Sequence, residues 1–298
     1  MLLHLIEIDD VHMENLITVY IPTKNRLDLL KRAVNSVLSQ THRPIELIIV
    51  SDGSTDGTCD YVNGLDENIA ITLIHNDTSV GACAARNQAI QVARGEFITG
   101  LDDDDIFLPH RLATFLAAWR RRQESGLRFS CLFDRRIIND GDSVALWDTQ
   151  ASVSAEQIVQ SNAVGNQVFT TPQRMKDAGS FDPAMPAWQD WDMWVRLIKT
   201  GGPAYSIQAN TYIMDISHEF ERITKKSSEK IVRAAHLFYE KHCQPGDRAG
   251  LLYSLAGYDQ IRLTLSDLGV MLRSKHAKFA LKKIRAGKFK MSLANSIR

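Results

Sequence analysis

The first hundred residues alternate between apolar strand-like segments and helix-like segments, and this order limits the possible folds more than any other feature. The strand-like segments, rich in β-forming residues, are 16–21, 45–50, 69–75 and 96–101. Helices are predicted between them at 28–40, 58–63 and 79–94. Strands that alternate with helices form a parallel sheet with right-handed crossovers. We therefore predict an α/β fold with a mostly parallel central sheet flanked by helices.

Four consecutive aspartates, Asp102 to Asp105, follow the fourth strand-like segment. Like charges this close raise one another's pKa, so a strand end that carries four of them favours a bound cation. Hard ions such as Mg2+ or Mn2+ take oxygen ligands, often one or two carboxylates together with water and substrate phosphates. A solvated acidic turn is the alternative. The apolar strand before the run and the segment 107–109 after it hold the acids between ordered elements, which favours the metal site.

Polar loops follow all four strand-like segments, at 22–26, 51–57, 75–77 and 102–105. In a parallel sheet the ligand lies beyond the carboxyl ends of the strands. The four loops are therefore predicted to converge on one rim of the sheet.

The rest of the chain is less regular. A helix is predicted at 109–125, paired strands at 128–138 and 143–147 around a turn, a short helix at 154–160 and a strand at 167–170. Trp188, Trp191 and Trp194 recur every three residues, which is more typical of core packing than of a site. Asp190 and Asp192 lie on the same predicted turn. From about 229 onward the pattern is helical, with a break at 245–247.

Composition excludes several classes of protein. The formal net charge of the 298 residues is zero, which argues against a nucleic-acid-binding protein. The cysteines are too far apart for a zinc site or a disulfide framework; they are Cys59, Cys83, Cys131 and Cys243. The N-terminal segment has no basic start and no long apolar core, and no apolar run reaches the about 18 residues that span a bilayer. We therefore expect a cytoplasmic protein.

Five motifs in order carry a resemblance to a known family. They are Pro22-Thr23-Lys24-Asn25-Arg26, Ser51-Asp52-Gly53-Ser54-Thr55-Asp56, Gly81 through Arg86-Asn87, Leu101 to Asp105, and Gln189-Asp190-Trp191-Asp192. Together they resemble a family 2 glycosyltransferase with the Rossmann-like GT-A fold, of the type that makes bacterial polysaccharide or lipopolysaccharide. The resemblance implies a UDP-sugar donor, an inverting reaction, and Mg2+ or Mn2+ held by a DxD motif.

The resemblance also implies a role for each matched position. The nucleotide-sugar pocket would be lined by Pro22, Thr23, Asn25, Arg26, Asp52, Ser54, Arg86, Asp102 and Asp103, with Asp52 on the uracil ring. Asp104 would bind the metal, as would His218, which resembles a late histidine of some members. Asp190 stands at the position of the catalytic base. Trp188, Gln189, Trp191 and Asp192 are candidates for the acceptor site. Two residues depart from the family pattern: Gln189 replaces the usual Glu, and Ser51 stands where Asp is common.

These roles predict a division of the chain and a function. We expect an N-terminal extension at 1–14, a catalytic domain at 15–225, and a helical, basic region at 226–298. Within the catalytic domain, 15–105 would bind the nucleotide and 106–225 the acceptor. The enzyme would move a hexose to a hydroxyl of a glycan or of a lipid-diphosphate-linked acceptor. The alternative is an inactive domain that binds a nucleotide sugar or a glycan. A metal-dependent phosphohydrolase of the haloacid dehalogenase type is another alternative. It would need its aspartate pair on the first strand, whereas the aspartates here follow the fourth.

The C-terminal region has no acidic residue after Asp267, while basic and apolar residues are interspersed there. Such a segment can lie on an anionic membrane, which would place the protein at the inner face of the cytoplasmic membrane. A helix packed on the catalytic domain with a solvated basic face is an equal alternative.

Overall fold

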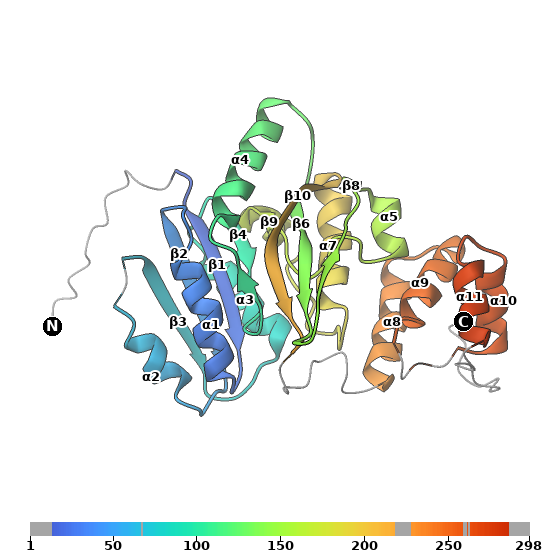
Figure 1. Cartoon of the computed structure of the whole chain (residues 1–298), viewed down its shortest axis with the longest axis horizontal. Helices are drawn as coiled ribbons and strands as arrows, with labels where there is room; N and C mark the ends of the chain where they lie inside the picture. Colours follow the sequence, from blue (N-terminus) through green and yellow to red (C-terminus); the bar gives the residue numbers. More distant parts are fainter. Residues whose placement is uncertain (1–13, 67, 218–227, 259–260, 262, 286–298) are drawn as a thin grey trace.

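The computed structural model of the chain describes residues 14–66, 68–217, 228–258, 261 and 263–285 (Figure 1). Its centre is a ten-stranded sheet in which the strand order is β3-β2-β1-β4-β9-β6-β10-β5. The strand β7 adds to β6 at one side of this path, and β8 adds to β10. The α/β fold expected from the alternating pattern is confirmed.

The first half of the chain forms the parallel part of the sheet. Its elements are β1 (Ile17–Thr23), α1 (Leu27–Leu38), β2 (Ile45–Asp52), α2 (Thr58–Asn63), β3 (Ala70–Asn76), α3 (Ala82–Val92) and β4 (Phe97–Gly100). The strands β2 and β4 both pair in parallel with β1, and β3 pairs in parallel with β2. The carboxyl ends of these strands therefore meet at one edge, as the loop pattern predicts.

The second half extends the same sheet with mixed directions. Its elements up to the last strand are β5 (Ile106–Phe107), α4 (Arg111–Glu124), β6 (Leu132–Asn139), β7 (Val144–Trp147), β8 (Ser152–Val153), α5 (Ala155–Gln160), β9 (Phe169–Thr170), α6 (Pro172–Asp177), α7 (Gln189–Gly201) and β10 (Ala204–Asp215). β9 runs antiparallel to β4, whereas β10 runs parallel to β6. The sequence patterns do not single out β5, β8, α6 or β10. The twelve-residue strand β10 shifts register twice against β6, and this breaks the period-two alternation that marks a strand.

Side chains of alternate residues in the central strands pack into two separate hydrophobic cores, one on each face of the sheet. Val19 and Ile21 belong to the cluster that packs α1 and α4 on one face, while Tyr20 belongs to the cluster on the other face with α3 and α7. This is the period of two expected of strands covered on both sides. The site therefore rests on a rigid, doubly covered sheet.

The C-terminal region consists of α8 (Ser228–His242), the 3-10 turn η3 (Pro245–Asp247), α9 (Arg248–Leu255), α10 (Leu265–Leu272) and α11 (Ala277–Arg285). These helices lie together at the end of the molecule opposite β3, beside α5 and α7 (Figure 1). Ile231 and Phe238 of α8 share one buried cluster with Trp191 and Trp194 of α7. The core of this region is thus continuous with that of the sheet.

The described part of the basic tail packs on protein. Ala280 of α11 is fully buried, and Phe279 and Ile284 pack against the same cluster as α7. Leu281 points outward and is 46% exposed. Across the parts of the chain that the structure describes, no helix combines the length and the apolar character needed to cross a bilayer.

Candidate active site

The carboxylate of Asp52, at the end of β2, is held by the loop that opens α3. Its oxygens accept hydrogen bonds from the Ser79 hydroxyl at 2.7 Å and from the backbone N–H groups of Val80 and Gly81 at 2.7 and 3.0 Å. Burial favours the neutral form of Asp52, but these hydrogen bonds outweigh it and lower the pKa. In this structure Asp52 is therefore an ionised carboxylate that joins β2 to the start of α3.

The loop after β1 is fixed by its own polar side chains. Asn25 has a positive φ of 51° and accepts a hydrogen bond from the Thr55 N–H at 2.8 Å. Its backbone N–H donates to the Ser54 hydroxyl at 3.1 Å. Asn25 and Ser54 thus hold the loops after β1 and β2 against each other. Pro22, near the end of β1, is in register with Val50 of β2.

Arg26 reaches from the β1 loop to the aspartate run. Its guanidinium donates to Asp103 at 3.1 Å and to Asp104 at 3.3 Å, while the Thr23 hydroxyl donates to Asp103 at 2.8 Å. Burial raises the pKa of Asp103 to about 6, against the lowering effect of Arg26. Arg26 therefore supplies part of the positive charge that the crowded carboxylates require.

Asp102 is the centre of the site's hydrogen-bond network. One oxygen accepts from Arg86 and Gln167, each at 3.1 Å, and the other accepts from Asn166 at 3.1 Å. The Arg86 guanidinium also donates to the Gln189 side chain at 3.0 Å. A single arginine of α3 thus connects the aspartate run to the first residue of α7.

Asp105 differs from the other three aspartates. It accepts hydrogen bonds from the Tyr212 hydroxyl at 2.6 Å and from the Asp215 backbone at 3.0 Å, and it is only 2% exposed. Both donors belong to β10, so Asp105 anchors the start of β5 to that strand.

Asp190 lies in the first turn of α7, partly buried beside this network. Trp188, immediately before the helix, adopts a left-handed conformation with φ 57°. Burial raises the pKa of Asp190, and the Trp191 N–H, Arg86 and Arg136 oppose that rise, whereas Asp102 adds to it. Asp102 and Asp190 therefore lie within electrostatic range of each other and of Arg86.

A loop that the sequence did not single out joins the two acids. Asn162 donates to Asp190 at 3.0 Å, and its neighbours Asn166 and Gln167 donate to Asp102. Neutral amides carry no periodic or charge pattern, so nothing in the sequence marked them. The loop 161–167 therefore positions both carboxylates at once.

The other residues predicted beside Asp190 face the protein interior. The Trp191 indole donates to the Ile158 carbonyl at 2.6 Å, and the Trp188 indole donates to the Tyr258 hydroxyl at 2.8 Å. Asp192 is fully buried and paired with Arg196, Lys241 and His242. Trp188, Trp191 and Asp192 thus contact the C-terminal helices, and their place in an acceptor site stays a prediction. Gln189 alone of the four reaches the network.

The aspartate run offers donors suited to a hard divalent ion. Asp102 and Asp104 present carboxylate oxygens at the rim, with side chains 25% and 10% exposed. No cluster of three or more metal-binding side chains occurs among the described residues. Mg2+ and Mn2+ need fewer, because phosphates and water complete their shell. His218, the other predicted ligand, lies outside the described residues.

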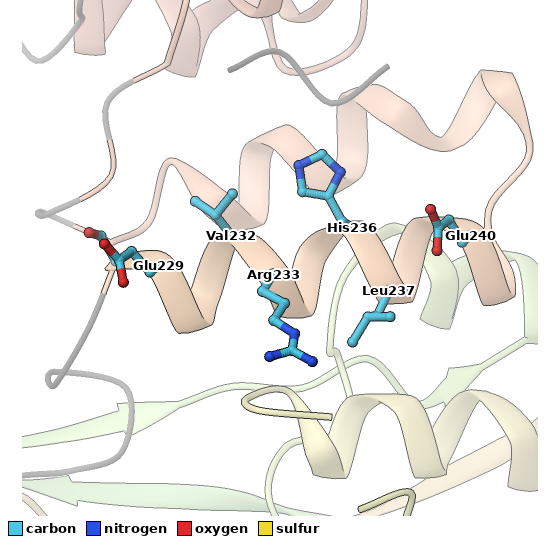
Figure 2. A pocket seen from close by; sticks show the side chains of 7 residues that line it. Glu229, Val232, Arg233, His236, Leu237 and Glu240 are labelled. Carbon is cyan, nitrogen blue, oxygen red and sulfur yellow. The ribbon is translucent and has the colours of Figure 1, made fainter. Parts of the chain in front are cut away.

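A separate shallow pocket lies on α8. Figure 2 shows its lining residues along this one helix, far in sequence from the motifs. They are Ser228, Glu229, Val232, Arg233, His236, Leu237 and Glu240. None of them was predicted to take part in the site.

Comparison with known proteins relates the chain to a family. The sequence model of the family described as glycosyl transferase family 2 matches residues 18–142 of this chain. The chain is 38% identical over 255 residues to WcaA of Escherichia coli, a protein named for colanic acid biosynthesis, with 83% of this chain and 88% of that protein covered. It is 28% identical over 201 residues to TuaG of Bacillus subtilis, named for teichuronic acid biosynthesis, with 64% and 75% covered.

Among solved structures, residues 1–349 of S. aureus TarS in complex with UDP-GlcNAc share the fold, with a TM-score of 0.60 and 15% identity over 94% of this chain and 98% of that one. The match to the family description covers the strands and loops that carry Asp52, Arg86 and the aspartate run. The identity to WcaA extends over most of both chains. On these grounds the chain belongs to glycosyl transferase family 2.

Proposed function

We propose that this glycosyltransferase moves a hexose from a UDP-sugar, with inversion and with help from Mg2+ or Mn2+, to a hydroxyl of a glycan or lipid-diphosphate-linked acceptor in bacterial surface polysaccharide synthesis. The observation that carries the proposal is the Arg86 bridge from Asp102 to Gln189, which brings the aspartate run beside Asp190. The names of WcaA and TuaG support the polysaccharide, and the UDP-GlcNAc complex of TarS supports the donor class.

The donor side of the reaction belongs to residues 15–105 in this proposal. Arg26 and Arg86 supply positive charge next to Asp102, Asp103 and Asp104, where a nucleoside diphosphate leaves. A divalent ion held by Asp104, with Asp102 nearby, would act as a Lewis acid on the diphosphate oxygens. Thr23, Pro22, Asn25, Ser54 and Asp52 shape the nucleotide end of the pocket.

The acceptor side belongs to residues 106–225, with α7 as its catalytic element. Asp190 accepts the proton of the attacking hydroxyl. Its raised pKa makes it a stronger base than an exposed aspartate, while Asn162 fixes the orientation of the carboxylate. Attack from the face opposite the leaving diphosphate inverts the anomeric centre, so an α-linked donor gives a β-linkage. General-base help of this kind is worth about 10²–10⁴ in rate.

The test is turnover with a panel of UDP-sugars and Mn2+, measured as UDP release with and without sugar acceptors. We expect Asp190→Asn to lower transfer by about 10²–10⁴-fold while UDP affinity, measured by calorimetry, stays within a few-fold. Asp177→Asn, the same change at an exposed residue of α6, is the matched control. If the Asp190→Asn variant folded and transferred sugar at a near-normal rate, the assignment of Asp190 as the base would be refuted. Donor binding without any release of UDP would favour the inactive binding domain instead.

A further inference from the structure

The side chain of Arg136, in the middle of β6, has no hydrogen-bonding partner among the described residues. Its Nε atom is buried and has no hydrogen-bonding partner in the described part of the chain, and its guanidinium carbon lies 5.4 Å from the centroid of the Trp147 ring. The other arginines near the site are paired: Arg26 with Asp103 and Asp104, and Arg86 with Asp102. A buried guanidinium nitrogen left without a partner is costly unless a ligand satisfies it.

The guanidinium of Arg136 is nevertheless held in place. A Cβ atom at Gly165, where φ is 101°, would lie 2.6 Å from Arg136 Nη1, so the bare backbone there closes over the guanidinium. The Gly165 carbonyl is itself fixed by the Trp194 indole at 2.8 Å. In addition, β7 pairs with β6 so that Trp147 is in register with Arg136. An arginine held by the close approach of a glycine backbone and by a neighbouring indole is pre-organised for binding.

Charge and strand position relate Arg136 to the proposed base, Asp190. It interacts electrostatically with Asp190, Asp105 and Tyr212. In the sheet, β6 is separated from β1 by β4 and β9, which places it about 14 Å from the strand that begins the nucleotide loops. Arg136 therefore lies within electrostatic range of Asp190, on a strand three positions away from β1.

Trp147 extends this position to the surface. Its side chain is 52% exposed, and its neighbours on β7, Leu146 and Val144, are 53% and 72% exposed. A half-exposed indole beside a fixed cation offers a flat apolar face for a sugar ring and a fork of N–H donors for an oxyanion.

We propose that Arg136 and Trp147 form an acceptor subsite for an oxyanion, either the carboxylate of a uronic acid or a phosphate ester, on the sugar that presents the attacked hydroxyl or on the next one. The subsite rests on the proposed function, because it assumes that Asp190 meets an acceptor. It narrows the acceptor to an acidic sugar.

Three probes that differ only at C6 test the subsite: methyl β-D-glucuronide, methyl β-D-glucoside 6-phosphate and methyl β-D-glucoside. Their affinities are measured by saturation-transfer NMR with UDP and Mg2+ present. We expect at least one acidic probe to bind about tenfold more tightly than the neutral one, and the preferred acid tells carboxylate from phosphate. Arg136→Gln should abolish that preference. Arg135→Gln, which removes the same charge from a residue paired with Asp148, should keep it.

Equal binding of all three probes by the unaltered chain, or an acidic preference that survives Arg136→Gln, overturns the subsite. A loss of UDP affinity beyond tenfold in Arg136→Gln also overturns it, because that would place the arginine at the donor. UDP calorimetry on the same samples separates the two proposals. If the unaltered chain fails to bind UDP, the proposed function fails; if UDP binds but the probes do not differ, the subsite alone fails.

Discussion

Replacing Asp192 with asparagine should destabilise the whole chain, because this carboxylate is the buried junction between α7 and α8. It is fully buried, accepts hydrogen bonds from Arg196 at 2.7 Å and His242 at 2.8 Å, and also pairs with Lys241. Removing one partner of a buried charge network costs about 3–5 kcal/mol, since the remaining charges stay desolvated. At roughly 2 °C per kcal/mol for a chain of this size, the thermal midpoint should fall by about 6–10 °C.

The assay is a thermal melt followed by circular dichroism at pH 7.5, with Asp182→Asn as the control. Asp182 shares Lys241 at 2.8 Å, but its side chain is 32% exposed, so its loss should cost about 1 kcal/mol or less. If Asp192→Asn melted within 2 °C of the unaltered chain, the account of this buried junction would be refuted. A drop of equal size in Asp182→Asn would show that Lys241, and not burial, carries the effect.

Two further predictions concern the metal and the pH dependence of stability. Asp104→Asn should remove most of the stimulation of turnover by Mn2+ while leaving the fold intact, which a Mn2+ titration of UDP release and a thermal melt will measure; unchanged stimulation would place the metal elsewhere. Burial lowers the pKa of His242 despite its hydrogen bond to Asp192. Below the ordinary histidine pKa of about 6.5 the unfolded chain then binds a proton that the folded chain does not, so stability is complete above that pH and falls as the pH drops. His242→Gln should flatten the fall in melting midpoint between about pH 7 and 5, and an unaltered slope would count against this residue.

The parallel half of the sheet could be predicted because its signals are local. Each strand from β1 to β4 is a short apolar run that ends in a polar loop, and the geometry of parallel strands brings those ends together without further information. The same reasoning anticipated that Asp52, Arg26 and Asp102 would lie at one rim.

The surroundings of the two aspartates of α7 could not be predicted from the spacing of its aromatic residues. Asp190 and Asp192 are two residues apart, which is about 200° around a helix, so the two carboxylates cannot face the same way. One lies by the network of Arg86 and the other is enclosed by α8. The sequence named both as candidates, because it did not reveal that a second helix would cover the tryptophan face.

The loop 161–167 and Arg136 could not be found from sequence for a different reason. The loop brings its amides to Asp102 and Asp190 only because β9, which follows it, pairs with β4 in the folded sheet. These amides belong to Asn162, Asn166 and Gln167. Arg136 stands out only in the folded sheet, where the described residues around it leave its side chain without a hydrogen bond. Neither feature has a spacing or a composition that a linear pattern could register.

The sharing of one short loop by Asp102 and Asp190 affects how kinetic data on this enzyme must be read. If Asp102 binds the donor and Asp190 is the base, as we propose, a substitution at Asn162 or Asn166 will disturb donor affinity and the chemical step together. A raised KM for the nucleotide sugar will then not by itself identify a residue that touches it. Double-mutant cycles between the loop and each acid are needed to apportion the effects.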